Sequence, residues 1–358
     1  MTEAEAMSRA LSLAWRGWGR VHPNPLVGAV VLRDGVIVGE GWHAEFGGPH
    51  AERVALQQAG DAARGATLVV TLSPCQHHGK QPPCTDAIID AGIARVVIAL
   101  DDPNPEAAGG TRLLAAAGIA VELGLASDMA AAQNAAFLHR HRNVERPWVA
   151  LKLATSVDGR IADSTGRSQW ISGDAAREWV HWLRAGFDAI AVGAGTVAKD
   201  DPSLTVRGAV TPRKVPLRVV VDDALTTTAD SRVVDTAGEA PTLILTSAAR
   251  AASPAAAALA RARVTVLPMH DLADGLHRLR EHGVERLLVE GGARLAGALL
   301  SEGLVDRFYH VQSPVWLGDH AREAFVGIGD TVLAEAPRWR VVEQRALGQD
   351  TLVVMDRP

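Results

Sequence analysis

The feature that most constrains the fold of this 358-residue chain is the alternation of short apolar runs with helical stretches, in two successive cycles. Short apolar, β-branched runs are typical of strands buried in a parallel sheet. Short connections between strands and helices predict an α/β layered sheet in each cycle. The first cycle ends at Arg146-Pro147. We therefore expect two domains, residues 1–146 and 147–358.

The first cycle opens with a helix and a hairpin. A helix is predicted over Thr2–Arg16, and strands Leu26–Leu32 and Val36–Gly39 flank Asp34-Gly35, a dipeptide typical of tight hairpin turns. After this hairpin we expect a mostly parallel sheet. The other predicted elements are strands at 67–72, 95–100 and 119–122 and helices at 50–60, 85–91, 111–117 and 128–142.

The second cycle has the same alternation and ends in two further strands that we expect to form an antiparallel edge. Residues 224–240 carry no clear pattern and are predicted to be a loop. The predicted strands are 148–154, 188–193, 217–222, 242–246, 264–267, 286–290, 308–311 and 351–355, and the helices are 174–185, 272–281 and 293–302.

Composition and charge exclude several classes of protein. No run approaches the roughly 18 apolar residues of a membrane helix, and the opening segment lacks the features of a secretory signal, so we expect a cytoplasmic protein. Two cysteines cannot form a disulfide framework. The net charge of −5 is spread evenly and no Lys/Arg cluster is present, so we expect no nucleic acid and no membrane partner.

The strongest chemical signal is His50 and Glu52 at a predicted helix start, followed by Cys75 and Cys84, each directly after a proline. One imidazole and two thiolates supply three zinc ligands and leave the fourth tetrahedral position open to water, as a catalytic site requires. A water bound there is acidified, and Glu52 can carry its proton to a leaving amine. This pattern is typical of zinc-dependent nucleobase deaminases. We predict a catalytic zinc with Glu52 as proton shuttle.

Three other interpretations are open at this point. Cys75 and Cys84 could be inert core thiols, with His50 as a helix cap. A structural zinc module would need a fourth protein ligand and would give Glu52 no function. A nucleic-acid-editing deaminase would share the zinc chemistry, but it predicts a basic groove and two residues between the cysteines. This chain has eight residues there and no basic cluster.

The wider sequence around these residues resembles the pyrimidine deaminase domain of the bifunctional riboflavin-biosynthesis deaminase/reductases. The resemblance rests on His-Pro-Asn-Pro-Leu-Val-Gly at 22–28, on Gly-Trp-His at 41–43 with Gly-Pro-His-Ala-Glu at 48–52, and on the long cysteine spacing. It implies a cytidine-deaminase-like three-layer α/β/α domain. It also implies that Asn24, His43 and Lys80 hold the pyrimidine substrate or its phosphate. As structural alternatives, Asn24 is a turn residue, His43 a packing residue and Lys80 a solvated loop charge.

The chemistry of the second cycle is less specific when its residues are considered alone. Glu290 and the glycines after it close a strand and open a helix, so backbone N–H groups could hold a dinucleotide pyrophosphate, although a plain tight turn has the same pattern. Arg184 and Arg207 could bind a sugar phosphate, although isolated arginines are commonly surface charges.

The second half resembles the reductase of the same bifunctional family, through Leu-Lys-Leu-Ala at 151–154, Ser-Gln-Trp-Ile at 168–171 and Leu-Thr-Val-Arg at 204–207. The resemblance implies a dihydrofolate-reductase-like α/β domain, NADPH as cofactor and a homo-oligomer, either a dimer or a larger assembly. Asp223 stands where such enzymes commonly have serine, which puts a cofactor contact there in doubt. Implied cofactor contacts are Ala154, Trp170, Thr196, Asp200, Gly292, Ala293, Arg294, Leu295, Ala296, Gly297 and Ala298. Implied substrate contacts are Lys152, Ser168, Arg184, Leu204, Arg207 and Glu290.

The function implied is a two-step conversion of a phosphorylated pyrimidine. The first half would deaminate 2,5-diamino-6-ribosylamino-4(3H)-pyrimidinone 5′-phosphate at a zinc site. The second half would use NADPH to reduce the ribosyl group to ribityl.

Overall fold

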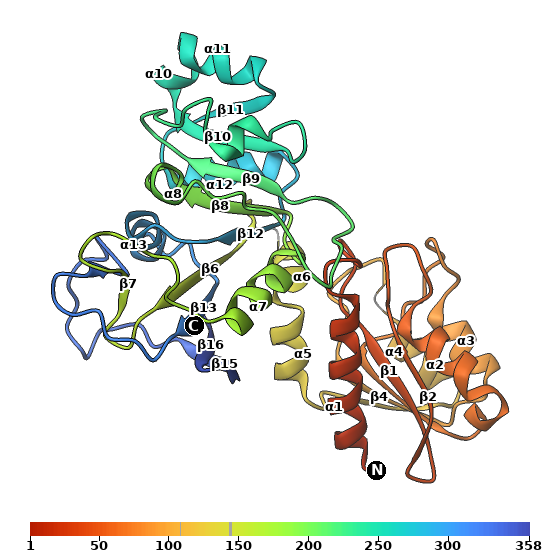
Figure 1. The fold of residues 1–358 in the computed structure, drawn as a ribbon. Helices are drawn as coiled ribbons and strands as arrows, with labels where there is room; N and C mark the ends of the chain where they lie inside the picture. The colour runs from red at the N-terminus through yellow and green to blue at the C-terminus, as the bar shows by residue number, and fades with distance from the viewer. Residues whose placement is uncertain (108, 143–144) are drawn as a thin grey trace. The chain divides into compact units, whose positions relative to one another are not determined.

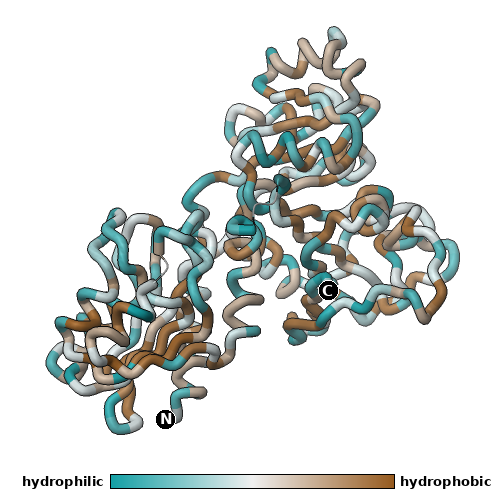
Figure 2. The backbone as a smooth tube through the Cα atoms, turned by 180° about the vertical axis from the view of Figure 1, so that it is seen from behind, coloured by the Kyte–Doolittle hydropathy of each residue, from teal (hydrophilic) through white to brown (hydrophobic). Residues whose placement is uncertain are grey.

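The computed structural model describes residues 1–107, 109–142 and 145–358. They form two compact units, Met1–Asn143 and Val144–Pro358, and each unit has a large sheet of its own (Figure 1). Hydrophobic residues, brown in Figure 2, are concentrated in continuous segments inside both units. No helix in the described part of the chain is long and apolar enough to cross a membrane.

The N-terminal unit is built on a five-stranded sheet in the order β2-β1-β3-β4-β5. The strands β1, β2 and β3 pair antiparallel, and β3, β4 and β5 pair parallel, as the sequence predicted for the region after the hairpin. Its strands are β1 Gly28–Arg33, β2 Val36–Trp42, β3 Thr67–Leu72, β4 Arg95–Leu100 and β5 Ala120–Leu123. Its helices are α1 Glu3–Ala14, α2 Ala51–Ala59, α3 Cys84–Asp90, α4 Gly110–Ala116, α5 Ser127–Gln133 and α6 Ala135–Arg140.

Helices cover both faces of this sheet, so the unit has three layers. Successive residues of a strand point to opposite faces. On β3, Val69 packs in the core that contains α1 and α5, whereas the next residue, Val70, packs in the core that contains α2, α3 and α4. Both residues have no exposed surface. The expected α/β/α arrangement is confirmed.

Two glycines let helices lie directly against the hairpin. A Cβ on Gly28 would lie 1.9 Å from the carbonyl oxygen of Ala10 in α1, and one on Gly41 would lie 2.2 Å from that of Ala51 in α2. No side chain fits at either position without displacing backbone. The contact at Gly41 sets the start of α2, which is the segment that carries His50 and Glu52.

The predicted single helix over residues 128–142 is wrong, because the chain forms two helices that meet at Asn134. Asn134 leaves helical geometry, with φ −106° and ψ 22°. Its buried amide accepts a hydrogen bond from the N–H of Leu26 at 2.8 Å and donates one to the carbonyl oxygen of Leu26 at 3.0 Å. These bonds tie the helix junction to the segment before β1 and satisfy backbone groups that lie outside the sheet.

The C-terminal unit has a nine-stranded sheet in the order β11-β10-β9-β8-β12-β6-β13-β16-β15. The strands from β11 to β13 pair parallel, and β16 and β15 add an antiparallel edge. Its main strands are β6 Trp148–Thr155, β8 Ala189–Gly193, β9 Leu217–Val221, β10 Thr242–Ser247, β11 Val264–Met269, β12 Arg286–Val289, β13 Arg307–Gln312, β15 Arg340–Leu347 and β16 Asp350–Asp356. Its longer helices are α7 Asp174–Arg184, α8 Ala194–Asp200, α11 Pro254–Arg261, α12 Leu272–Glu281 and α13 Ala293–Ser301.

Several elements of this unit are absent from the sequence prediction. Strand β15 lies at the sheet edge with most of its residues exposed, so it lacks the apolar run that identifies a buried strand. Residues 224–240 contain the short helix α9 at Arg232–Asp235, where a loop was predicted. A small second sheet pairs β7 Arg160–Ala162 with β14 Arg322–Glu323.

We predict that Asn134→Ala destabilises the N-terminal unit. The change leaves the N–H and C=O of Leu26 unpaired in a buried environment, where each such group costs ~1–3 kcal/mol. Differential scanning calorimetry should show the transition of the N-terminal unit at a lower temperature. Met129→Ala, at a side chain 58% exposed on α5, is the matched control and should leave it unchanged. An unchanged transition in Asn134→Ala would contradict this account of the helix break.

Candidate active sites

Two helix starts and one strand end bring His50, Cys75 and Cys84 together. His50 is the residue immediately before α2, and Cys84 is the first residue of α3. Cys75 follows β3, and its carbonyl oxygen accepts hydrogen bonds from the N–H groups of Cys84 and Thr85 at 3.1 and 3.3 Å. These backbone bonds hold the long loop between the two cysteines closed at its base.

The geometry of this trio suits a zinc ion. The ligand atoms all lie within 4.8 Å of one another. The Nδ1 atom of His50 lies 3.3 Å from Sγ of Cys84 and 3.6 Å from Sγ of Cys75. A tetrahedral zinc with ordinary Zn–N and Zn–S bonds separates nitrogen and sulfur ligands by ~3.6 Å. The described residues offer no other cluster of this kind.

The electrostatics favour a thiolate in this trio. Hydrogen bonding with the Cys84 thiol, and next with His50, lowers the pKa of Cys75 to about 4. The same contact with Cys75 raises the pKa of Cys84. A thiolate is the form that binds metal, so one of the three ligands carries the required negative charge even without a bound cation.

Glu52 stands in the first turn of α2, beside the trio but outside it. It is 3% exposed, and burial raises the pKa of its carboxyl group. It lines the same cavity as His50 and Cys75. A carboxyl group whose pKa is raised above its usual value releases a proton less readily, which suits a group that must both accept and donate one.

A cavity of about 270 Å³ opens beside these residues and includes the predicted Asn24, His43 and Lys80 in its wall. Nδ1 of His43 lies 3.0 Å from the carbonyl oxygen of Pro49, so it carries the proton, and Nε2 accepts from the Asn24 amide at 3.0 Å. Burial lowers the pKa of His43, which keeps the ring neutral. Lys80 extends over the Phe46 ring with its Nζ 4.0 Å from the ring centroid.

The cavity wall also contains residues that the sequence analysis did not select. Asp102 and Asn104 follow β4, and burial raises the pKa of Asp102 to about 6. Polar residues directly after a strand that runs parallel to β3 are a signal that could have identified them, because such strand ends share one edge. The other unpredicted polar residues in the wall are Ser73, His77, Gln81, Arg140 and His141.

The C-terminal unit holds a larger cleft of about 1230 Å³. Glycines Gly291 and Gly292 adopt φ +81° and +87° at its floor, where a Cβ on Gly292 would lie 3.2 Å from Oγ1 of Thr196. This turn precedes α13 and opposes α8, so two helix N-termini border the cleft. The predicted residues that line it are Lys152, Ala154, Ser168, Thr196, Asp200, Glu290, Gly292, Ala293, Arg294, Leu295 and Ala298.

The other residues predicted for this half lie outside the cleft wall. Ala296 is fully buried, and a Cβ on Gly297 would lie 2.0 Å from the carbonyl oxygen of Val326, so both face the protein interior. Trp170 is 70% exposed and packs under the guanidinium of Arg177. The remaining three residues of this group are Arg184, Leu204 and Arg207.

A buried charge cluster lies beside the cleft and contributes Lys152 and Glu290 to its wall. Arg184 forms a two-pronged ion pair with Glu290, with N–O distances of 2.5 and 2.8 Å. Burial alone would favour a neutral Glu290, but Arg184 holds the pKa of that carboxyl group below its usual value. Burial lowers the pKa of Lys152, which lies next to this pair. Ser168 donates a hydrogen bond to Asp200 at 3.0 Å.

The cleft wall contains several residues that were not predicted. Asp222 and Asp223 follow β9, and Met269, His270 and Asp271 follow or end β11. These too are carboxyl ends of parallel strands, where ligands commonly bind in α/β sheets. Asp223, which the sequence analysis left in doubt, lines the cleft.

Comparison with known proteins gives matches in both halves. Residues 1–100 match the family described as cytidine and deoxycytidylate deaminase zinc-binding region, and residues 147–353 match the RibD C-terminal domain. The riboflavin biosynthesis protein RibD of Escherichia coli is 42% identical, over 98% of this chain and 98% of its own length. The RibD protein of Mycobacterium tuberculosis is 39% identical, over 98% of this chain and 96% of its own.

Solved structures give the same result. The deaminase/reductase of Thermotoga maritima matches with a TM-score of 0.83 and 37% identity, covering 99% of each chain. A structure of Acinetobacter baumannii RibD matches with a TM-score of 0.81 and 36% identity, again covering 99% of each chain. The similarity extends through both units.

We predict that the purified protein holds about one zinc per chain and that the Cys75→Ser, Cys84→Ser double variant loses it, because two of three ligands are removed. Metal analysis by mass spectrometry measures both. His77→Ala is the matched control, since His77 lines the cavity outside the trio, and should keep the metal. Stoichiometric zinc in the double variant would mean that other residues bind the metal.

Proposed function

The chain belongs to the family of bifunctional RibD deaminase/reductases of riboflavin biosynthesis, and from this premise we propose which residues carry each step. Its N-terminal domain has the cytidine-deaminase-like fold, and its C-terminal domain has the dihydrofolate-reductase-like fold of the RibD reductases. We assign the deaminase to residues 1–146 and the reductase to residues 147–358. The proposed substrate is 2,5-diamino-6-ribosylamino-4(3H)-pyrimidinone 5′-phosphate.

In the deaminase, His50, Cys75 and Cys84 hold zinc, and the observation that carries the assignment is their spacing together with the buried Glu52 beside them. Zinc bound there supplies a water acidic enough to ionise near neutral pH. With zinc in place, Glu52 would accept a proton from the water that attacks C2 of the pyrimidine. It then delivers a proton to the exocyclic amine, which leaves as ammonia.

The remaining residues of the cavity orient the substrate. Neutral His43 fixes the Asn24 amide, whose second N–H and oxygen are then available to the pyrimidine ring. The side chains of Lys80, Arg140 and His141 place cationic or ionisable groups in the same wall. Such groups suit the dianionic phosphate of the proposed substrate.

In the reductase, the cleft between the N-termini of α8 and α13 would hold NADPH, which when bound would supply hydride to C1′ of the ribosyl group. The glycine turn at 291–292 leaves room for a pyrophosphate close to the backbone. Reduction at C1′ would break the bond from C1′ to the ring oxygen, which would take up a proton, and the ribosyl group would become ribityl. Lys152, in the cleft wall beside Glu290, faces the reacting sugar.

Substrate phosphate in the reductase is bound by Ser168, Arg184 and Arg207. The ion pair with Glu290 fixes the Arg184 fork, and the carbonyl oxygen of Thr205 accepts a further hydrogen bond from Arg184 at 2.8 Å. A fixed guanidinium loses little conformational entropy when it binds a phosphate. The cofactor contacts proposed outside the cleft wall, Trp170, Ala296 and Gly297, lack this structural support.

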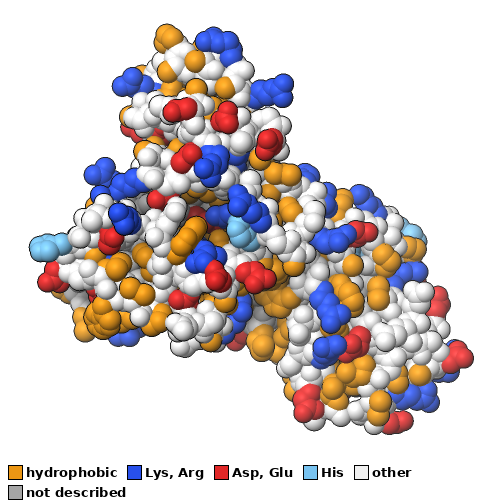
Figure 3. Space-filling model, in the orientation of Figure 1, with side chains coloured by type: hydrophobic (Ala, Val, Ile, Leu, Met, Phe, Trp, Pro, Cys, Tyr) orange, Lys and Arg blue, Asp and Glu red, His pale blue; other side chains and the backbone are white. Residues whose placement is uncertain are grey.

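We also propose a homo-oligomer. Several large apolar side chains are exposed on the C-terminal domain, including Trp316 at 75% and Leu333 at 84%. Figure 3 shows hydrophobic side chains on the face of this domain near β7. Exposed apolar patches of this kind are typical of protein interfaces.

We predict that Glu52→Gln keeps its zinc but loses deamination by ~10²–10⁴-fold, because general acid–base catalysis contributes about that factor. Ammonia release from the diaminopyrimidinone ribosyl phosphate measures the loss. The same variant should oxidise NADPH at the wild-type rate when it is given the deaminated substrate. Equal losses of both rates would mean that the two domains are not independent catalysts.

The mirror-image variant is Lys152→Met. It should deaminate at the wild-type rate and bind NADPH with unchanged affinity by calorimetry, but NADPH consumption should fall by at least tenfold, a loss of about 1.4 kcal/mol of transition-state stabilisation. A variant that binds neither NADPH nor NADH would show that Lys152 supports the cofactor site. Full reductase activity in Lys152→Met would show that Lys152 has no role in the reductase site.

A further inference from the structure

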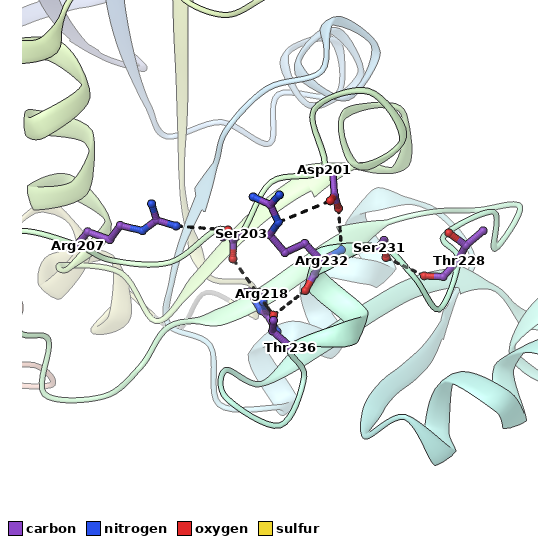
Figure 4. A network of polar contacts seen from close by, with 8 residues as sticks. All are labelled: Asp201, Ser203, Arg207, Arg218, Thr228, Ser231, Arg232 and Thr236. Atoms are coloured by element: carbon purple, nitrogen blue, oxygen red, sulfur yellow. Dashed lines mark hydrogen bonds and ion pairs between the residues drawn. The ribbon is translucent and has the colours of Figure 1, made fainter.

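Arg218 is a buried charge that neither proposed active site uses. It stands near the start of β9, has no exposed surface, and is the largest fully buried side chain in the described residues. Its guanidinium donates to Oγ1 of Thr236 at 2.7 Å and, more weakly, to the carbonyl oxygen of Ser203 at 3.4 Å (Figure 4). It also donates to the carbonyl oxygen of Ala240 at 2.7 Å. All three acceptors are neutral.

Stability does not explain this arrangement. Removing a guanidinium from water is costly, and neutral acceptors offset that cost only in part. Nε of Arg218 has no hydrogen-bond partner, and burial lowers the pKa of the guanidinium. Val220, two residues further along the same strand and therefore on the same face, belongs to a buried hydrophobic cluster, and replacements of buried charges by apolar side chains of similar volume are commonly neutral or stabilising.

The hydrogen bonds of Arg218 connect it, through Ser203, to Arg207, the exposed arginine proposed to bind the substrate phosphate. Ser203 accepts from Arg218 with its carbonyl oxygen and from Nη2 of Arg207 with its side-chain oxygen, in both cases at 3.4 Å. Nε of Arg207 donates to Oγ1 of Thr205 at 3.4 Å. One residue therefore separates the buried guanidinium from the exposed one, as the left side of Figure 4 shows.

The segment that carries Arg207 is bent and is held at its start as well. Asp201 and Leu204 have φ +37° and +50°, a region that side chains other than glycine disfavour. The carboxylate of Asp201 accepts from the N–H of Arg232 at 2.7 Å. The carbonyl oxygen of Arg232 accepts in turn from Thr236, the residue that also binds Arg218. These contacts surround the segment from Asp201 to Ser203 and fix its path.

We propose that Arg218 is a positioning residue of the reductase, which acts through Ser203 to hold Arg207 where it binds the phosphomonoester of the substrate. This inference rests on the proposed role of Arg207. It gives a reason for a charged group at this buried position, since the guanidinium reaches two separate chain segments at once, Ser203 and the turn from Thr236 to Ala240. No apolar side chain can bond the carbonyl of Ser203.

The test is Arg218→Met in the full-length protein, which keeps side-chain volume and removes the hydrogen bonds. The KM for the phosphorylated, deaminated substrate should rise about tenfold, as expected for the partial loss of one charge-assisted hydrogen bond. The kcat and the NADPH affinity should change less than about twofold. The deaminase, in the other domain, serves as the internal control and should be unchanged.

A double-mutant cycle separates this proposal from the proposed function. Arg207→Ala alone should raise KM, and adding Arg218→Met should raise it little further, because Arg218 acts through the missing side chain. If Arg207→Ala leaves KM unchanged, the assigned role of Arg207 fails. If Arg207→Ala raises KM but Arg218→Met does not, or if the two effects are additive, only the positioning role is overturned.

Two further variants distinguish the proposed effect on KM from a simple loss of stability. Thr236→Val removes one acceptor of Arg218 with little change in volume and should raise KM in the same direction by a smaller factor. Arg307→Met removes another buried arginine, 5% exposed and paired with Asp356 at 2.6 Å, far along the chain from Arg207. It should lower the unfolding temperature without the selective rise in KM. If Arg307→Met raised the KM selectively as well, the rise in Arg218→Met would be a consequence of general destabilisation and the positioning role would be overturned.

Discussion

Parallel strand pairing is the constraint on which both sites depend. Strands that run parallel end at the same edge of their sheet, and the loops that leave that edge have no further strand to pair with. In the N-terminal domain, Cys75 follows β3 and Asp102 follows β4. In the C-terminal domain, Glu290 follows β12 and Asp222 follows β9. The sheet gathers groups that are far apart in the sequence and leaves them facing one cavity in each domain.

The helices add charge to this arrangement. His50 and Cys84 stand at the starts of α2 and α3, and the glycine turn at 291–292 stands at the start of α13. Backbone N–H groups at a helix start favour anionic groups, which suits a metal-binding thiolate beside α3 and the pyrophosphate proposed to bind at α13. Close approach of α2 to the hairpin, which Gly41 permits, fixes the position of Glu52 relative to the zinc ligands.

The buried carboxyl groups of the two sites have pKa values shifted in opposite directions, because only one of them is paired with an arginine. Burial raises the pKa of Glu52, which suits a group that must accept and release a proton. In the reductase, Arg184 outweighs the effect of burial and keeps Glu290 charged. Arg218 is a third case, in which the buried guanidinium donates hydrogen bonds to neutral acceptors, and we propose that these contacts position the segment that carries Arg207.

The sequence by itself determined the fold class, the bifunctional family and most buried strands, because apolar runs identify strands and because the motifs in both halves, among them the spacing of His50, Cys75 and Cys84, carry the family resemblance. Strand β3 at Thr67–Leu72 and strand β4 at Arg95–Leu100 have the predicted bounds. Only the tertiary structure decided the break at Asn134, the exposed strand β15, the place of Asp102 in the cavity wall and the path from Arg218 to Arg207. These features depend on contacts with residues that are distant in the sequence, such as Leu26 for Asn134. A local sequence pattern does not show which distant segment will pack against it.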